Sequence, residues 1–100
     1  MHTDLPSTTP ALVPLTANAG NTPVLLLDGS QPYIELQDCA EMRLSAARGL
    51  MRGLASLSPR QADDLDLDLV GMVHAAHVLL TDACDLVAAA HLAARRESRR

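Results

Sequence analysis

The 100-residue chain has no phenylalanine, no tryptophan and no lysine, and Tyr33 is its single aromatic residue. Aromatic side chains bury large apolar areas, so a core built without them gains less free energy at each buried position. Sixteen alanines and eighteen leucines provide most of the apolar surface instead. One copy of so short a chain can bury only a limited area, and self-association is the expected remedy.

Other absences narrow the class of protein. Cys39 and Cys84 lie far apart and form neither a C-x-x-C motif nor a zinc-binding pattern, so we expect reduced, buried thiols. The N-terminus has no basic start followed by an apolar stretch, and no apolar run approaches the ~18 residues that a membrane span needs. Together these absences predict a cytoplasmic protein with no membrane contact.

The dominant pattern is a regular alternation of three-residue and four-residue steps between apolar residues over positions 62–93. This spacing predicts one long amphipathic helix, which we place at residues 59–95. Alanine recurs at one heptad position and mostly leucine at the other, a combination that lets a neighbouring helix approach closely. A third position adds Val73, Leu80 and Val87, so the apolar face is wider than one partner helix covers.

These positions define a predicted interface. Its members are Ala62, Leu65, Leu69, Met72, Val73, Ala76, Leu79, Leu80, Ala83, Leu86 and Val87. A helix from the same chain would cover part of this surface, and a second copy of the chain would cover the remainder.

A second apolar stripe with the same spacing runs from Tyr33 to Leu54 and predicts a helix over residues 31–57. Ser30 as the cap, with Pro32 in the first turn, is one start for this helix, and Asp38 as the cap is the other. The opposite face carries polar and charged residues that are expected to face solvent: Glu41, Ser45, Arg48 and Arg52.

Gly49 and Gly53 lie four positions apart in this predicted helix, where each costs about 1 kcal/mol relative to alanine. Two interpretations remain open. The pair marks a place where another backbone passes closely, or these are small residues that occur by chance in an alanine-rich chain.

The segment Ser58-Pro59-Arg60-Gln61 is the clearest local signal in the chain. Ser58 is suited to be the cap, Pro59 the first helical residue, and Gln61 the third residue of a capping box. The segment separates the two predicted helices with almost no loop. We therefore expect the helices to be antiparallel neighbours within a domain that spans residues 24–97.

The flanking segments have different compositions. Residues 1–23 are rich in proline and threonine and are predicted to form a disordered arm. Residues 24–27 are apolar and end at the turn signal Asp28-Gly29-Ser30, which favours a short β segment. Residues 98–100 form a basic tail. The expected fold class is all-α: an antiparallel αα-hairpin that dimerises into a four-helix bundle, with the arm and the short β segment attached.

Charge is segregated along the second predicted helix. An acidic patch stands at its start and consists of Asp63, Asp64, Asp66 and Asp68, whereas the arginines Arg95, Arg96, Arg99 and Arg100 stand at its end. Each cluster suits the helix dipole at its own end, and the polarity favours an antiparallel arrangement of two copies. A homodimer is the expected assembly, and another protein is a further candidate partner. Four cations on an acidic body without an aromatic stacking platform argue against nucleic acid.

Chemically reactive residues do not form a recognisable motif. His74 and His77 are three positions apart, but His91 and Cys84 continue that row at seven-residue steps, about 10 Å along a helix and too far to share one metal ion. Asp82 and Asp85 flank Cys84 and would raise the pKa of a nucleophilic thiol rather than lower it. We therefore expect no enzyme, no cofactor and no metal site within one copy.

Residues 24–87 resemble a family of short bacterial proteins of unknown function. The similarity is carried by Gly29, by the alanine- and leucine-rich stretch at 36–50, and by His77-Val78-Leu79-Leu80 followed by Ala83 and Leu86. The resemblance implies a helical hairpin and implies no activity or site residues.

The sequence favours a small non-enzymatic interaction or regulatory module that acts through a self-associating helical hairpin. One alternative is a small inhibitor of phage type that docks its acidic patch on a nucleic-acid-handling complex. A third hypothesis is a histidine-based binder of a metal or cofactor, with ligands from more than one helix or copy.

Overall fold

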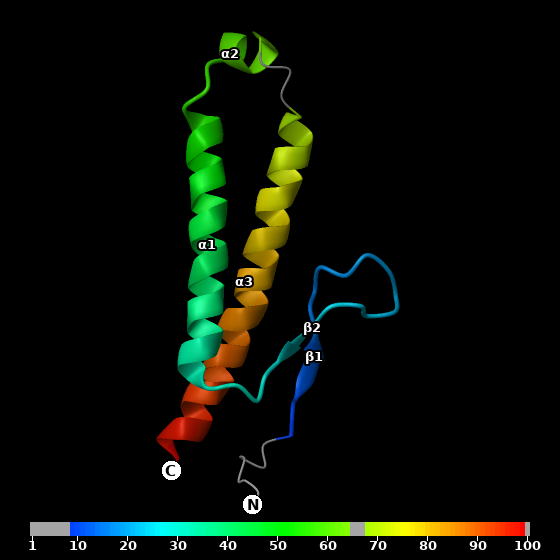
Figure 1. Cartoon of the computed structure of the whole chain (residues 1–100), viewed down its shortest axis with the longest axis vertical. Coiled ribbons are helices and arrows are strands. Elements are labelled where there is room, and N and C mark those ends of the chain that lie inside the picture. The colour runs from blue at the N-terminus through cyan, green and yellow to red at the C-terminus, as the bar shows by residue number, and fades with distance from the viewer. Residues whose placement is uncertain (1–8, 65–67, 100) are drawn as a thin grey trace, which may run out of the picture.

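The computed structural model describes residues 9–64 and 68–99. Within these residues the chain is mostly helical, in the order β1 (Leu12–Pro14), β2 (Leu26–Asp28), α1 (Tyr33–Ala55), α2 (Pro59–Asp64) and α3 (Leu69–Ser98). The helices α1 and α3 lie side by side and run in opposite directions, and the short α2 crosses the far end (Figure 1). This arrangement is compatible with the predicted hairpin. The small sheet means that an all-α class does not describe the whole fold.

Alanines allow α1 and α3 to pack closely. Ala40 and Ala47 of α1 recur at a seven-residue spacing, as do three alanines of α3, Ala76, Ala83 and Ala90, and each has an exposed fraction of 2% or less. Because an alanine side chain is short, the two helix backbones can approach at these positions. Leucines then close the end of the pair near β2, where Leu27, Leu36 and Leu86 form the core with Ala93.

The predicted single helix over residues 59–95 is wrong, because α2 ends at Asp64 and α3 begins only at Leu69. Asp68 has non-helical dihedral angles, with φ of −82° and ψ of 81°, and its side chain caps α3. Its Oδ1 accepts a 2.9 Å hydrogen bond from the backbone N–H of Gly71. An aspartate is more stable at such a cap than inside a helix, since its carboxylate competes for nearby backbone N–H groups.

The absence of a side chain at Gly71 leaves space for the carboxylate of Asp68 that caps α3. A Cβ atom at Gly71 would meet the Asp68 carboxylate. Asp68 therefore starts a helix rather than continuing one. Leu65 and Asp66 of the predicted helix, and the side chain of Ala62, lie outside the described residues.

The start of α1 differs from both predicted starts. Its cap position is Pro32, which makes no side-chain cap hydrogen bond, and the Ser30 hydroxyl donates to Asp28 instead. The last turn of α3 provides the missing cap, because the N–H of Tyr33 donates to Glu97 Oε2 at 2.7 Å. A carboxylate at a helix N-terminus is favourable for the exposed N–H groups and for the helix dipole. One helix therefore caps the other.

The predicted capping box at Ser58 is confirmed. The N–H of Ser58 donates to Gln61 Oε1 at 2.9 Å, and the N–H of Gln61 donates to Ser58 Oγ at 3.1 Å. These reciprocal bonds satisfy two backbone donors at the start of α2. The signal identified the start of the six-residue helix α2 rather than of the long helix.

The strands β1 and β2 form an antiparallel pair in which Val13 lies opposite Leu27. We call residues 11–29, which include both strands and their loop, the ribbon. The prediction of a disordered arm over residues 1–23 is contradicted at Leu12–Pro14, which form β1, and residues 1–8 lie outside the described residues. Asn18 organises the loop: its Oδ1 accepts from the N–H groups of Val24 and Leu25, and its Nδ2 donates to two carbonyls. The side chain thus adds four hydrogen bonds to the backbone bond from the N–H of Leu15 to the carbonyl of Leu25.

The two glycines of α1 have no close neighbours. A Cβ atom at Gly49 or at Gly53 would meet no atom within 4 Å. No other segment of the described chain approaches them, so no backbone of the same copy makes the predicted close contact. The other interpretation, small residues that occur by chance, stays a prediction.

Candidate functional site

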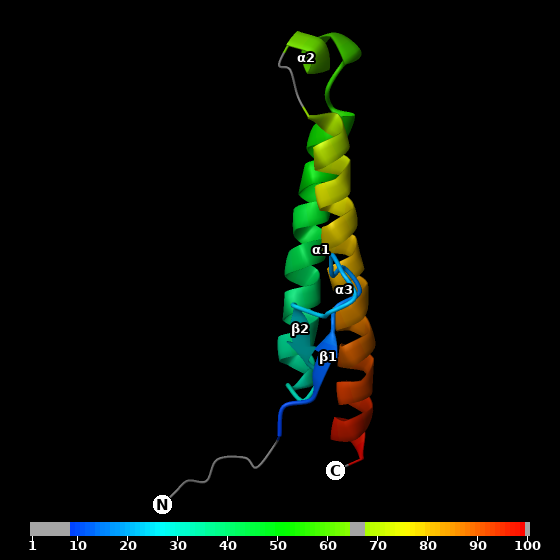
Figure 2. The same ribbon diagram turned by 90° about the vertical axis from the view of Figure 1, so that its right-hand side faces the viewer.

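The ribbon is fixed to one face of the two long helices, which we call the ribbon face (Figure 2). Asp85 of α3 accepts two hydrogen bonds from Thr16, at 2.7 Å from the N–H and at 2.8 Å from the hydroxyl. Leu27 is buried in the core, and Leu15 packs against it. A charged acceptor that takes two donors from one residue holds that residue in a defined position. The ribbon is therefore held by polar and apolar contacts together.

Asp28 organises the turn between the ribbon and α1. Its carboxylate accepts from the N–H of Ala11, from the N–H and hydroxyl of Ser30, and from the side-chain amide of Gln31, at distances of 2.6–3.1 Å. Hydrogen bonds to a carboxylate favour its ionised form. The bonds from Ser30 and Gln31 hold the pKa of Asp28 well below its ordinary value of 3.8.

This arrangement makes the stability of the ribbon depend on pH. Because the pKa of Asp28 is lower in the folded chain than in the unfolded chain, its stabilising effect is complete above about pH 5 and is lost as the pH falls below 3.8. We expect the urea midpoint of the parent to fall more between pH 6 and pH 2.5 than that of Asp28→Asn, whose side chain does not titrate. Equal losses in the two proteins would contradict the assignment.

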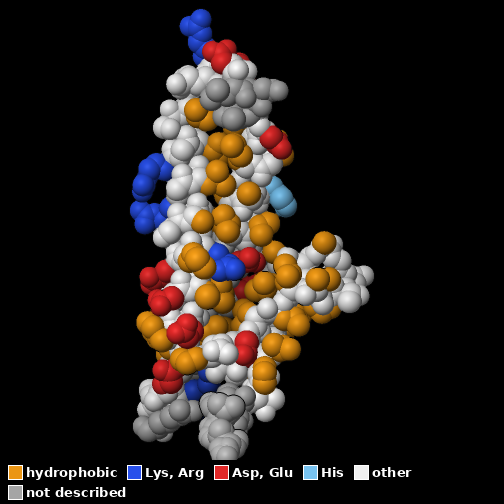
Figure 3. Space-filling model, in the orientation of Figure 1, with side chains coloured by type: hydrophobic (Ala, Val, Ile, Leu, Met, Phe, Trp, Pro, Cys, Tyr) orange, Lys and Arg blue, Asp and Glu red, His pale blue; other side chains and the backbone are white. Residues whose placement is uncertain are grey.

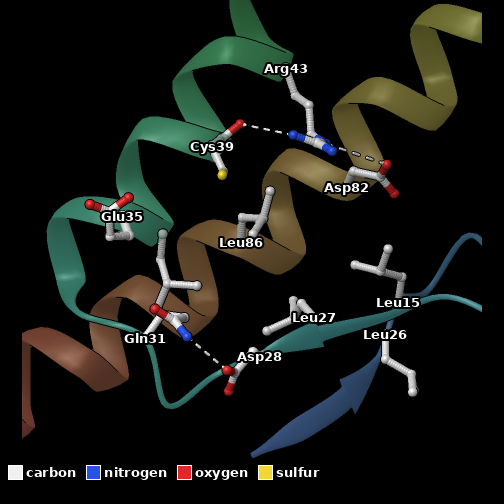
Figure 4. Close-up of a pocket in the computed structure, with 11 residues that line it drawn as sticks. Leu15, Leu26, Leu27, Asp28, Gln31, Glu35, Cys39, Arg43, Asp82 and Leu86 are labelled. Atoms are coloured by element: carbon white, nitrogen blue, oxygen red, sulfur yellow. Dashed lines mark hydrogen bonds and ion pairs between the residues drawn. The ribbon is translucent and has the colours of Figure 1, made fainter. Parts of the chain in front are cut away.

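A pocket of about 360 Å³ lies between the ribbon, α1 and α3 (Figure 4). Its lining residues come from all three: Leu15, Leu26, Leu27, Asp28, Gln31, Glu35, Leu36, Cys39, Arg43, Asp82 and Leu86. Arg43 bridges the two helices at the rim, with its Nε 3.7 Å from Asp82 Oδ2 and its Nη1 3.4 Å from the Cys39 carbonyl oxygen. The pocket is thus an apolar cavity with a charged edge.

The opposite face of the two helices is apolar and uncovered. A helix turns by about 100° per residue, so Leu44 and Met51, each four residues after a buried alanine of α1, lie on the side away from Arg43. By the same rule Val73 and Leu80 lie on the side of α3 away from Asp82 and Asp85. We call this surface the back face and define it by Leu44, Met51, Leu69, Val73, Leu80 and Val87.

Most of the back-face side chains are exposed in a single copy. The exposed fractions are 55% for Val73, 39% for Leu80 and 49% for Met51, and Val87 is half-buried. The other predicted interface residues behave differently. Ala76, Ala83 and Leu86 are buried, and Met72 and Leu79 are half-buried. Hydrophobic side chains also gather between α1 and α3 above the ribbon on the face seen in Figure 3.

The predicted acidic patch is divided between two helices. Asp68 caps the start of α3, whereas Asp63 and Asp64 are exposed in α2, and Asp66 lies outside the described residues. Arg95, Arg96 and Arg99 are exposed at the end of α3, although Arg96 also donates to the carbonyl oxygen of Gln31 at 3.2 Å. The acidic and basic ends are thus separated by the length of α3, about 40 Å.

Both thiols are exposed, so the expectation of buried cysteines is wrong. Cys39 lines the pocket (Figure 4), and Cys84 borders the back face, one position after the buried Ala83. The histidines His74, His77 and His91 are exposed as well. Among the described residues, no three His, Cys, Asp or Glu side chains are grouped so that they could hold a metal ion. The histidine-based hypothesis would need ligands from a second copy.

By length and composition alone, α3 could cross a membrane, because an 18-residue window of it has a mean hydropathy of 1.3. The expectation that no apolar run approaches such a length holds for unbroken runs but not for this helix. Asp82 and Asp85 lie in the middle of α3, where they bond to Arg43 and Thr16.

Comparisons of the chain with family models, with curated proteins and with solved structures find no match. The resemblance to short bacterial helical-hairpin proteins therefore stays a prediction, and the functional argument depends on the surfaces described above.

Proposed function

We propose that the protein is a small non-enzymatic interaction module that self-associates through its back face. Two α1–α3 pairs pack back to back as a four-helix bundle, and the two ribbons point outward and remain available to other proteins. The observation that carries this proposal is the row Leu44, Met51, Val73 and Leu80, whose side chains are exposed in a single copy. Contiguous apolar surface of this kind marks an association site in a water-soluble protein.

The back face suits a second helical layer better than the ribbon face does. On the ribbon face the strands and their loop stand out from the helices (Figures 1 and 2). The apolar residues there, such as Leu50, Leu54 and Leu79, are already half-buried. Among the residues of the two long helices, Val73 and Met51 of the back face are more exposed than these three. The ribbon exposes apolar side chains of its own, such as Val24 and Leu12, but its strands leave no flat helical layer on that side.

The available area is sufficient for a stable dimer. Two helices spaced by about 10 Å present a layer about 20 Å wide and, over the 23 residues of α1, about 35 Å long. This corresponds to about 700 Å² per copy, close to the about 800 Å² that each partner buries in a typical specific interface. Apolar burial supplies the affinity in this arrangement.

Charge selects the orientation of the two copies. A two-fold axis near Leu80, the middle of the row Val73, Leu80 and Val87, packs α3 antiparallel on α3 of the second copy. Asp68 at the start of α3 then approaches the end of the other α3, where Arg95 lies. Exposed ion pairs contribute only about 0–1 kcal/mol each, so they set orientation rather than affinity.

The test is a single charge placed on the back face. We expect the parent to sediment as a dimer at micromolar concentration and Leu80→Glu to sediment as a monomer with similar helical content, because a buried unpaired carboxylate is strongly unfavourable.

Leu92→Glu is the matched control, since Leu92 is also on α3 and 56% exposed but lies on its outer side. It should remain a dimer. A parent that sediments as a well-folded monomer at micromolar concentration, or loss of the dimer in Leu92→Glu alone, would overturn the proposal.

A further inference from the structure

The pocket on the ribbon face has the properties of a small-molecule site, and we propose that it binds an amphipathic cation, a ligand with an aliphatic body and an ammonium head. The body would lie on the leucines and the head at the charged rim. The pocket is on the opposite side of the helices from the back face. The proposal of a ligand site and the proposal of a dimer can therefore be tested independently of each other.

The floor of the pocket is suited to an aliphatic chain. Leu27, Leu36 and Leu86 reach it from β2, α1 and α3 and are buried in the core. A volume of about 360 Å³ is at the lower end of the range for small-ligand pockets and suits a chain of about eight carbons. Each methylene group removed from water there contributes about 0.8 kcal/mol in the ordinary accounting of apolar burial.

The rim determines the sign of the head group. Three carboxylates, from Asp28, Glu35 and Asp82, line the pocket with one guanidinium, from Arg43. The guanidinium is paired with Asp82, so the remaining charge is negative. Asp28 stays ionised because four donors hold its carboxylate. A negative rim attracts an ammonium group and repels a carboxylate, and this excludes fatty acids as the ligand class.

Two thiols make the proposal measurable in the unmodified protein. Cys39 lines the pocket, whereas Cys84 is exposed on the other side of the helices. We expect saturating octylamine at pH 7 to slow the alkylation of Cys39 by iodoacetamide about tenfold, because access limits thiol reactivity, and to leave Cys84 unchanged. Mass spectrometry of the two cysteine peptides gives both rates from one sample. Octanoate should bind about tenfold more weakly than octylamine.

Two variants separate the roles of rim and floor. Glu35→Gln should weaken the binding of octylamine severalfold and leave the binding of 1-octanol unchanged, because only the charged ammonium head interacts with the carboxylate. Cys39→Phe should fill the cavity from its edge. Calorimetry should then detect no binding of octylamine or of 1-octanol, while the helical content stays the same. Equal protection of Cys84, equal affinity for octanoate, or undiminished binding to Cys39→Phe would each overturn the proposal.

Discussion

Replacing Leu80 with cysteine is expected to convert nearly all of the protein into a disulfide-linked dimer under mild oxidation. If the two-fold axis passes near Leu80, this residue faces its own copy across the interface. Two Cα atoms must approach to about 4.4–6.8 Å for a disulfide, which facing core positions of packed helices satisfy. The experiment uses a Cys39→Ser, Cys84→Ser background, so that the new thiol is the only one present. Non-reducing electrophoresis measures the linked fraction.

Neighbouring positions test the direction of packing. With antiparallel α3 helices, Val73 faces Val87 of the second copy. Val73→Cys and Val87→Cys should each remain unlinked alone and should link when the two proteins are mixed. Parallel α3 helices would instead link Val73→Cys to itself. Leu92→Cys, which points outward, is the control and should not link. No linkage at Leu80 combined with linkage at Leu92 would refute the proposed geometry.

The helical part of the fold was predictable because its signal is repetitive. Apolar steps of three and four residues recur through both long helices, and burial follows them at Ala40, Ala47 and Ala83. The capping box at Ser58 was also predictable, because it needs only residues within one turn of each other. Local and periodic patterns of this kind can be read without knowing the tertiary contacts.

The contacts that position the ribbon are non-local, and the sequence pattern did not reveal them. Thr16 and Asp85 are 69 positions apart, and neither residue type is unusual in its own segment. The N–H of Tyr33 is capped by Glu97 in the same way, across the antiparallel pair. The prolines of the arm suggested disorder, but the side chain of Asn18 hydrogen-bonds the backbone of the loop between β1 and β2. Only the tertiary fold brings these groups together.

The break after α2 shows how one local preference outweighed a periodic one. The heptad continues through residues 65–69, which favoured an uninterrupted helix. The structure instead has non-helical dihedral angles at Asp68, whose side chain caps α3. The back face was predictable as a wide apolar surface at Val73, Leu80 and Val87. The pocket was not, because its floor joins leucines from three separate segments.

Enlarging one seam alanine should destabilise the fold more than any other conservative change. Ala90 is fully buried in the core cluster that includes Ala40 of α1. Leucine at this position adds three carbons where there is no space for them, and such overpacking costs about 1–3 kcal/mol. For a domain of this size each kcal/mol lowers the melting temperature by about 4–8 °C, so we expect a drop of about 5–20 °C for Ala90→Leu.

Ala88→Leu provides the matched control, because Ala88 lies on the same helix but is exposed. The same added atoms reach water there, and the melting temperature should change little. Both variants are compared with the parent by circular dichroism at one protein concentration, since self-association makes the midpoint depend on concentration. If Ala90→Leu has the same melting temperature as the parent, α1 and α3 do not pack closely at their alanines. The two helices are then farther apart, and the back face is wider.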